Sequence, residues 1–126
     1  MEPIKNADHF IHFQSNLAPL KDILDQKNYS KVFVFADTNT AEHCLPIFRS
    51  LLDDLGDFDI IETDPGEENK NIDFCIGIWK TLLDFGADRK CLMINLGGGV
   101  ITDMGGFIAS TYKRGIDFVN IPTTLL

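Results

Sequence analysis

Cysteine, histidine and basic residues are scarce in this chain of 126 residues, and each scarcity excludes a class of protein. The three cysteines are widely spaced in apolar surroundings, which predicts reduced core thiols and argues against a disulfide framework or a metal knuckle. The three histidines are too scattered to form a set of metal ligands. Only 11 lysine and arginine residues oppose 19 acidic ones, so the net charge is −8. We therefore expect no nucleic acid as a partner, because phosphate backbones favour a basic surface.

Long apolar runs are also missing. No stretch approaches the roughly 20 apolar residues that a membrane-spanning helix needs, and residues 1–6 have neither the charge nor the apolar centre of a signal peptide. We therefore expect no membrane partner and a cytoplasmic location. With 44% hydrophobic residues, the chain is long enough for one folded domain over residues 1–126 and too short for two domains of ordinary size.

The sequence alternates between strand-like and helix-like segments. Runs of β-branched and aromatic residues, bounded by polar or turn residues, predict strands over residues 9–13, 32–36, 59–63, 91–96 and 117–121. Apolar residues at helical spacing predict one helix between each pair of strands, the last over residues 101–112. The inward positions expected in the second helix are Leu45, Phe48, Leu51, Leu52 and Leu55, and those in the third are Ile72, Ile76, Trp79, Leu82 and Leu83. This order predicts an α/β fold, a Rossmann-like parallel sheet with helices on both faces, whose ligands lie beyond the carboxyl ends of the strands.

Three consecutive glycines, residues 97–99, lie between a predicted strand and the predicted helix 101–112. Glycine has no Cβ, so its backbone can come close to a ligand and leave peptide N–H groups pointing at phosphate oxygens. The N-terminus of the following helix adds its positive dipole end. The loop departs from the dinucleotide pattern G-x-G-x-x-G, because Thr102 stands where that pattern has glycine or alanine. The loop alone leaves two interpretations open, a phosphate site and a tight connection.

Polar residues after the other strands are the remaining candidates. Asp37 and Asn39 follow strand 32–36 and would either bind a ribose diol or cap a helix, and their spacing favours the cap. Lys70 stands near a predicted helix start, where the dipole disfavours a cation, and Glu67 lies three residues before it. The two would clamp the polar edge of a ligand or form an exposed ion pair, and the ion pair is favoured.

Two charged residues follow the glycines. Asp103 is expected in the first turn of the helix, where it either stabilises the helix end or meets a ligand hydroxyl. Arg114 is the strongest candidate for binding an anion, because a guanidinium group donates two parallel hydrogen bonds to phosphate. The alternative for Arg114 is an interaction with the C-terminal end of the helix dipole.

Three motifs occur in a specific order along the chain. They are PGEENK at 65–70, LGGGVITDMGGF at 96–107 and TYKRGIDFVNIPTTLL at 111–126. Together they resemble 3-dehydroquinate synthase and cover most of residues 37–126. The resemblance implies an NAD-dependent lyase of the shikimate pathway that requires zinc or cobalt and works as a homodimer. Its substrate would be a phosphorylated sugar acid, 3-deoxy-D-arabino-heptulosonate 7-phosphate, and its products 3-dehydroquinate and phosphate.

The resemblance also implies roles for individual residues, by motif position. Arg114 would bind the substrate phosphate, and the residues that meet NAD would be Asp37, Asn39, Glu67, Lys70, Gly98, Gly99, Val100, Asp103, Thr123 and Thr124. The family's metal ligands and catalytic lysines lie in a helical domain that would follow Leu126, so we expect no metal site and no catalytic residue within this chain. Departures from the family pattern are Thr102 in place of a glycine, and Met104 and Gly105 in place of the usual small or aliphatic pair.

The chain ends on two apolar residues directly after a threonine pair, which leads us to expect a truncated enzyme. Such a part would fold, bind NAD weakly, lack turnover and expose an apolar patch where the missing domain would pack. Alternatives are another sugar-phosphate cyclase that makes a carbasugar or aminocyclitol precursor, a metal-dependent polyol dehydrogenase, or a nucleotide-binding module without catalysis. The basic segment 112–115 favours a phosphorylated substrate over a polyol.

Overall fold

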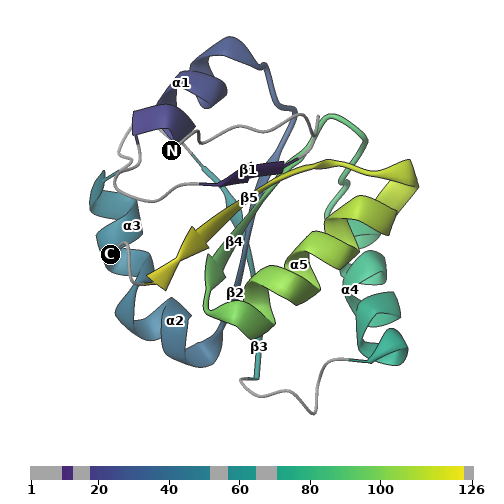
Figure 1. Cartoon of the computed structure of the whole chain (residues 1–126). Helices are drawn as coiled ribbons and strands as arrows, with labels where there is room; N and C mark the ends of the chain where they lie inside the picture. The colour runs from purple at the N-terminus through teal and green to yellow at the C-terminus, as the bar shows by residue number, and fades with distance from the viewer. Residues whose placement is uncertain (1–9, 13–17, 52–56, 65–70, 124–126) are drawn as a thin grey trace.

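Five parallel strands form one sheet at the centre of the molecule (Figure 1). The computed structural model describes residues 10–12, 18–51, 57–64 and 71–123. In spatial order the strands are β1 (Phe10–His12), β5 (Asp117–Pro122), β4 (Leu92–Gly97), β2 (Val32–Asp37) and β3 (Asp59–Thr63). Every neighbouring pair is parallel, as the alternation of strands and helices predicted.

Helices cover both faces of this sheet. Their bounds are α1 (Ala18–Gln26), α2 (Thr38–His43), α3 (Leu45–Leu51), α4 (Ile72–Asp84), α5 (Gly99–Thr111) and the short 3₁₀ helix η3 (Tyr112–Arg114). Figure 1 shows α4 and α5 together on one side of the sheet, while α1 and α3 lie on the other. None of the helices in the described ranges is long and apolar enough to cross a membrane.

Two apolar cores result, one on each face of the sheet. Strand β4 contributes to both, because Leu92, Ile94 and Leu96 pack with α1 and α3 while Met93 packs with α4 and α5. All six residues of β4 are buried, which is the pattern of a central parallel strand covered on both faces. The predicted fold class, a Rossmann-like parallel sheet between two helical layers, is therefore confirmed.

The second predicted helix is in fact two helices. The chain turns at Cys44, which ends α2, and α3 begins at Leu45. Pro46 explains the break, because proline has no N–H to donate and its ring would clash with the carbonyl four residues earlier in a continuous helix. Leu45 and Phe48 are buried as predicted, whereas the predicted inward residues Leu52 and Leu55 lie outside the described residues.

The prediction for the buried face of α4 was wrong at three positions. Ile72, Ile76 and Leu83 are 55%, 38% and 54% exposed. The buried face consists instead of Cys75, Ile78 and Leu82, with Phe74 and Trp79 packed beside it. Apolar residues occur almost all round this helix, so the sequence spacing is compatible with two different buried faces. Packing against α5 and β2 determines which of the two is buried.

Candidate functional site

The carboxyl ends of four strands meet at one edge of the sheet. Asp37 at the end of β2 is level with Thr63 at the end of β3, and Gly97 at the end of β4 is level with Pro122 at the end of β5. Phe35 pairs with Asn95, two residues before the ends of β2 and β4, which places these two strand ends at the same height. We call this the carboxyl edge, and both α2 and α5 begin there (Figure 1). The candidate residues after β2, β4 and β5 are thus brought together, as predicted.

The glycine loop leaves the start of α5 open. Gly98 is the N-cap of α5 and provides no side chain to bind the first peptide N–H groups of the helix. A Cβ placed on Gly98 or Gly99 would meet no atom within 4 Å, whereas one on Gly97 would lie 2.8 Å from the Cβ of Ile101. Gly97 therefore serves the packing of the helix on the strand. Gly98 and Gly99 instead leave space in front of peptide groups that suit a phosphate.

Thr102, which departs from the dinucleotide pattern, does not enter this space. Its hydroxyl donates to the carbonyl oxygen of Gly99 at 3.2 Å, and its own peptide N–H donates to the carbonyl of Gly98 at 3.0 Å. The side chain is therefore held against its own helix, and the departure leaves the loop accessible.

Asp37 caps α2, which was the favoured interpretation of its position. The peptide N–H of Thr40 donates to Asp37 Oδ1 at 2.8 Å, and the Thr40 hydroxyl oxygen accepts from the peptide N–H of Asp37 at 3.0 Å. This capping box does not use Asp37 Oδ2, which has no hydrogen-bond partner among the described residues. Asn39 is the second residue of α2 and is exposed, so the cap predicted for it was wrong.

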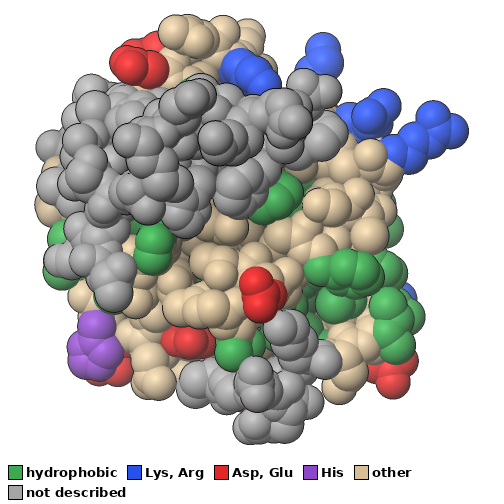
Figure 2. Space-filling view, viewed as in Figure 1, with side chains coloured by type: hydrophobic (Ala, Val, Ile, Leu, Met, Phe, Trp, Pro, Cys, Tyr) green, Lys and Arg blue, Asp and Glu red, His purple; other side chains and the backbone are tan. Residues whose placement is uncertain are grey.

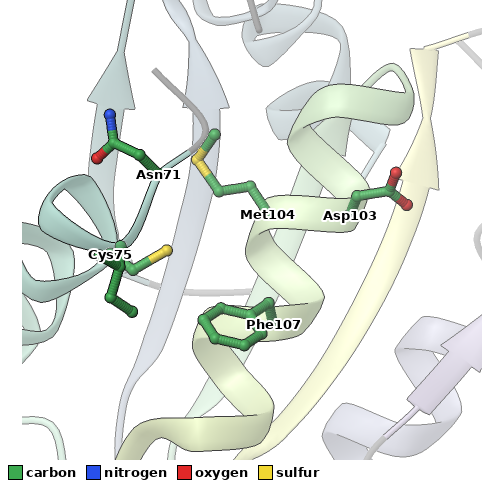
Figure 3. Close-up of a pocket in the computed structure, with 6 residues that line it drawn as sticks. Asn71, Cys75, Asp103, Met104 and Phe107 are labelled. Carbon is green, nitrogen blue, oxygen red and sulfur yellow. The ribbon is translucent and has the colours of Figure 1, made fainter. Parts of the chain in front are cut away.

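Asp103 lies further from the loop than predicted. Because α5 already begins at Gly99, Asp103 is its fifth residue and not part of its first turn. It lines a hollow of about 230 Å³ between α4 and α5, and Figure 3 shows its carboxylate directed away from Asn71 and Cys75 on the opposite wall. The other lining residues are Asn71, Ile72, Cys75, Met104 and Phe107, so most of the wall is apolar.

Apolar side chains also gather on the outer surface of α4 and α5 (Figure 2). Phe107 on α5 and Ile72 on α4 both line the hollow and are 48% and 55% exposed, and Ile76 on α4 is 38% exposed. The ring of Trp79 lies 6.4 Å from that of Phe107. The expected patch was one that packs against a further domain, and that role of this surface stays a prediction.

Arg114 lies at the opposite edge of the sheet from the glycine loop. Helix α5 leads back across the sheet from Gly99 to Thr111, a path of about 20 Å for its length, and η3 follows before β5 begins. Arg114 is exposed there, next to Lys113, and both have positive φ values, 71° and 46°. The structure therefore does not bring Arg114 together with the carboxyl-edge residues.

The remaining candidates are only partly described. Val100 is the second residue of α5 and Thr123 follows β5 directly, and both are half-buried at the carboxyl edge. Glu67, Lys70 and Thr124 lie outside the described residues. Within the described ranges no group of three or more histidine, cysteine, aspartate or glutamate residues could hold a metal ion.

The cysteines are free thiols, as predicted. Burial raises the pKa of both Cys75 and Cys91, so each stays protonated at neutral pH. Asp88 has a pKa below its ordinary value because the hydroxyl of Ser30 and then the peptide N–H of Lys90 donate to its carboxylate. Cys91 directly precedes β4 and Asp88 lies four residues before this strand, so both lie at the edge where the strands begin, across the sheet from the glycine loop.

Sequence reasoning missed one polar pair in the sheet. Asn95 is completely buried in β4, and its Nδ2 donates to Oδ1 of Asn120 on β5 at 3.1 Å. The only signal in the sequence was a single amide within the apolar run 91–96. Asn95 was correctly assigned to a strand, but its hydrogen-bond partner depends on the order of the strands in the sheet.

The fold is shared with enzymes whose structures are known. Superposition on 2-deoxy-scyllo-inosose synthase gives a TM-score of 0.77 at 20% identity, covering 93% of this chain and 34% of that one. A second structure of such a synthase is a complex with carbaglucose-6-phosphate, NAD⁺ and Co²⁺ (TM-score 0.76, 19% identity, 90% of this chain, 32% of that one). ValA, a 2-epi-5-epi-valiolone synthase from Streptomyces hygroscopicus with NAD⁺ and Zn²⁺ bound, gives 0.71 at 22% identity over 97% of this chain and 34% of that one. These likenesses show the class of fold, a parallel α/β domain that covers about a third of each of these enzymes.

Sequence comparison defines the family. Residues 60–126 match the family model described as 3-dehydroquinate synthase N-terminal. The chain is 46% identical over 110 residues to the 3-dehydroquinate synthase of Parabacteroides distasonis, covering 85% of this chain and 30% of that protein. It is 47% identical over 97 residues to the enzyme of Clostridium beijerinckii, covering 76% and 28%. The chain belongs to the 3-dehydroquinate synthase family, matches its N-terminal portion, and spans about 30% of the length of these relatives.

Proposed function

We propose that this chain provides the NAD-binding part of a 3-dehydroquinate synthase, which converts 3-deoxy-D-arabino-heptulosonate 7-phosphate into 3-dehydroquinate and phosphate. The observation that carries the proposal is the glycine loop at the carboxyl edge, with an uncapped helix start and open space at Gly98 and Gly99. The identity of 46–47% to 3-dehydroquinate synthases, against 20% to 2-deoxy-scyllo-inosose synthase, favours this substrate over that of another cyclase.

The described residues fit a dinucleotide. The peptide N–H groups at the start of α5 would donate to the diphosphate, and the helix dipole would stabilise its charge. Asp37 would accept hydrogen bonds from a ribose diol through Oδ2 while Oδ1 continues to cap α2. The further contacts that we propose, by motif position, are Asn39, Glu67, Lys70, Val100, Asp103, Thr123 and Thr124. Bound NAD would supply reversible hydride transfer, and this chain would bind and orient it.

The metal and the catalytic residues would come from outside this chain. We propose zinc or cobalt as the metal, in line with the Co²⁺ and Zn²⁺ in the two ligand-bound cyclase structures. Arg114 would bind the substrate phosphate, but it lies across the sheet from the glycine loop. Such a contact therefore requires a second copy of the chain, or a further part of the full-length protein, to bring the substrate to Arg114. We further propose that the full-length enzyme is a cytoplasmic homodimer.

Two measurements test this proposal. Isothermal titration calorimetry of the chain with NAD is expected to show weak saturable binding, and an absence of heat even for the full-length enzyme would contradict the proposal. The chain with NAD and either Zn²⁺ or Co²⁺ is expected to release no phosphate from 3-deoxy-D-arabino-heptulosonate 7-phosphate. Formation of 3-dehydroquinate under these conditions would show that the catalytic set is complete without a further domain.

A further inference from the structure

Helix α5 packs closely on the sheet because two of its glycines face the strands. A Cβ on Gly106 would lie 3.3 Å from the ring of Phe118 on β5. A Cβ on Gly105 would overlap the carboxamide of Asn95 on β4, so no larger residue fits between this helix and this side chain. The second and third turns of α5 therefore rest directly on β4 and β5.

The carboxamide of Asn95 is the polar part of this contact. Its Nδ2 donates to Asn120, and its Oδ1 is buried without a hydrogen-bond donor among the described residues. A Cβ on Gly105 would meet this Oδ1 before any other atom, so the oxygen lies against the Cα of Gly105. A Cα–H group is a weak donor to such an oxygen. In the orientation shown, the Cα–H group faces an acceptor oxygen and not an NH₂ group.

This contact is close to the glycine loop along both segments. Asn95 precedes Gly97 by two strand residues, about 7 Å, and Gly105 follows Gly99 by six helical residues, about 9 Å. The chain from Asn95 to Gly105 therefore leaves the sheet through the glycine loop and returns to it along the first two turns of α5. The contact between Asn95 and Gly105 joins the two ends of this segment. Any outward shift of α5 at Gly105 moves the peptide groups of Gly98 and Gly99.

We propose that Asn95 is a positioning residue for the dinucleotide site. Its buried carboxamide sets the distance of α5 from β4 through Gly105 and so places the open N-terminus of α5 where a diphosphate binds. The proposal rests on the proposed function and deepens it, because it names a residue that determines cofactor affinity without touching the cofactor. Asn120 supports Asn95 by accepting its hydrogen bond from the neighbouring strand.

A compensating pair of substitutions tests this inference. Gly105→Ala inserts a methyl group into the space that the carboxamide of Asn95 occupies, and Asn95→Ala removes that carboxamide. In the double variant the added methyl group takes the place of the removed carboxamide. Gly77→Ala is the matched control, because a Cβ at this exposed position of α4 meets no atom within 4 Å. The affinity of each variant for NAD is measured by calorimetry, at a temperature where circular dichroism shows all of them folded.

Gly105→Ala is expected to weaken NAD binding at least tenfold, and the double variant to recover to within threefold of the unchanged chain. Gly77→Ala should bind as the unchanged chain does. A folded Gly105→Ala variant with unaltered affinity would overturn the proposal, and so would a double variant that stays as weak as Gly105→Ala. If Gly105→Ala alone does not fold, the double variant decides, since recovery of folding and affinity by Asn95→Ala requires the contact.

A second readout separates this inference from the proposed function. With glycine-selective ¹⁵N labelling and no NAD present, the amide resonances of Gly98 and Gly99 should move in Gly105→Ala and return in the double variant. If neither the unchanged chain nor the full-length enzyme binds NAD, the proposed function fails, and these resonances still decide whether Asn95 places the loop. Resonances that stay in place in Gly105→Ala would refute the positioning role.

Discussion

Replacing Gly99 with alanine is expected to change the stability of the fold and the affinity for NAD in opposite directions. The backbone at Gly99 is helical and a Cβ there meets no atom within 4 Å, so alanine fits without strain. Alanine at a helical position is more favourable than glycine by about 0.5–1 kcal/mol, which corresponds to a rise in melting temperature of about 2–5 °C for a domain of this size. The same methyl group occupies the open space that a phosphate must enter. We expect NAD affinity to fall at least tenfold, which is about 1.4 kcal/mol.

The matched comparison is Gly97→Ala. Its Cβ would lie 2.8–3.1 Å from three side-chain atoms of the buried Ile101, so overpacking should lower the free energy of unfolding by about 1–3 kcal/mol. Urea unfolding followed by circular dichroism measures stability, and calorimetry with NAD measures affinity. A Gly99→Ala variant that binds NAD as tightly as the unchanged chain would refute the phosphate site. A Gly97→Ala variant of unchanged stability would refute the packing argument.

Three further substitutions test other contacts. Asp37→Ala should lower the unfolding free energy by about 1–2 kcal/mol through loss of the capping box with Thr40. Asp37→Asn should keep the cap and lose NAD affinity. Equal NAD affinity of the unchanged chain and both variants would exclude a ribose contact. Burial and then the hydrogen bond to Asp117 raise the pKa of Tyr29 above its usual value near 10, so its stabilising contribution is present below pH 10 and lost above it. Tyr29→Phe should therefore make the loss of stability between pH 10 and 11 less steep, measured by urea unfolding, and an unchanged slope would contradict this. Tyr112→Phe removes a 2.8 Å hydrogen bond to a backbone carbonyl and should cost about 1 kcal/mol in the same assay, while unaltered stability would show that water replaces it.

The sequence predicted the sheet well because its signals are local. Strand β3 was predicted at its observed bounds, and β2, β4 and β5 within one residue at each end. Each of these strands is a short apolar run that ends in polar or turn residues, and such runs are read without knowing their neighbours. The same reasoning placed Asp37 at a helix cap.

The errors arose where the answer depends on a distant contact. The buried face of α4 could not be selected from its own sequence, because Ile76 and Ile78 each belong to a plausible helical stripe. The partner of Asn95 is set by the strand order β5-β4-β2, which no local pattern encodes. The place of Arg114 likewise follows from the path of α5, which carries it to the edge of the sheet opposite the glycine loop.

The left-handed backbone at Lys113 and Arg114 makes the charged side chains at these two positions costly for thermal stability. Residues with side chains lose about 1 kcal/mol or more in this conformation, while glycine adopts it freely. A library selected only for survival at high temperature should therefore enrich glycine or asparagine at positions 113 and 114. The two cations therefore stand there at a cost in stability, and backbone strain of this kind is common at functional sites.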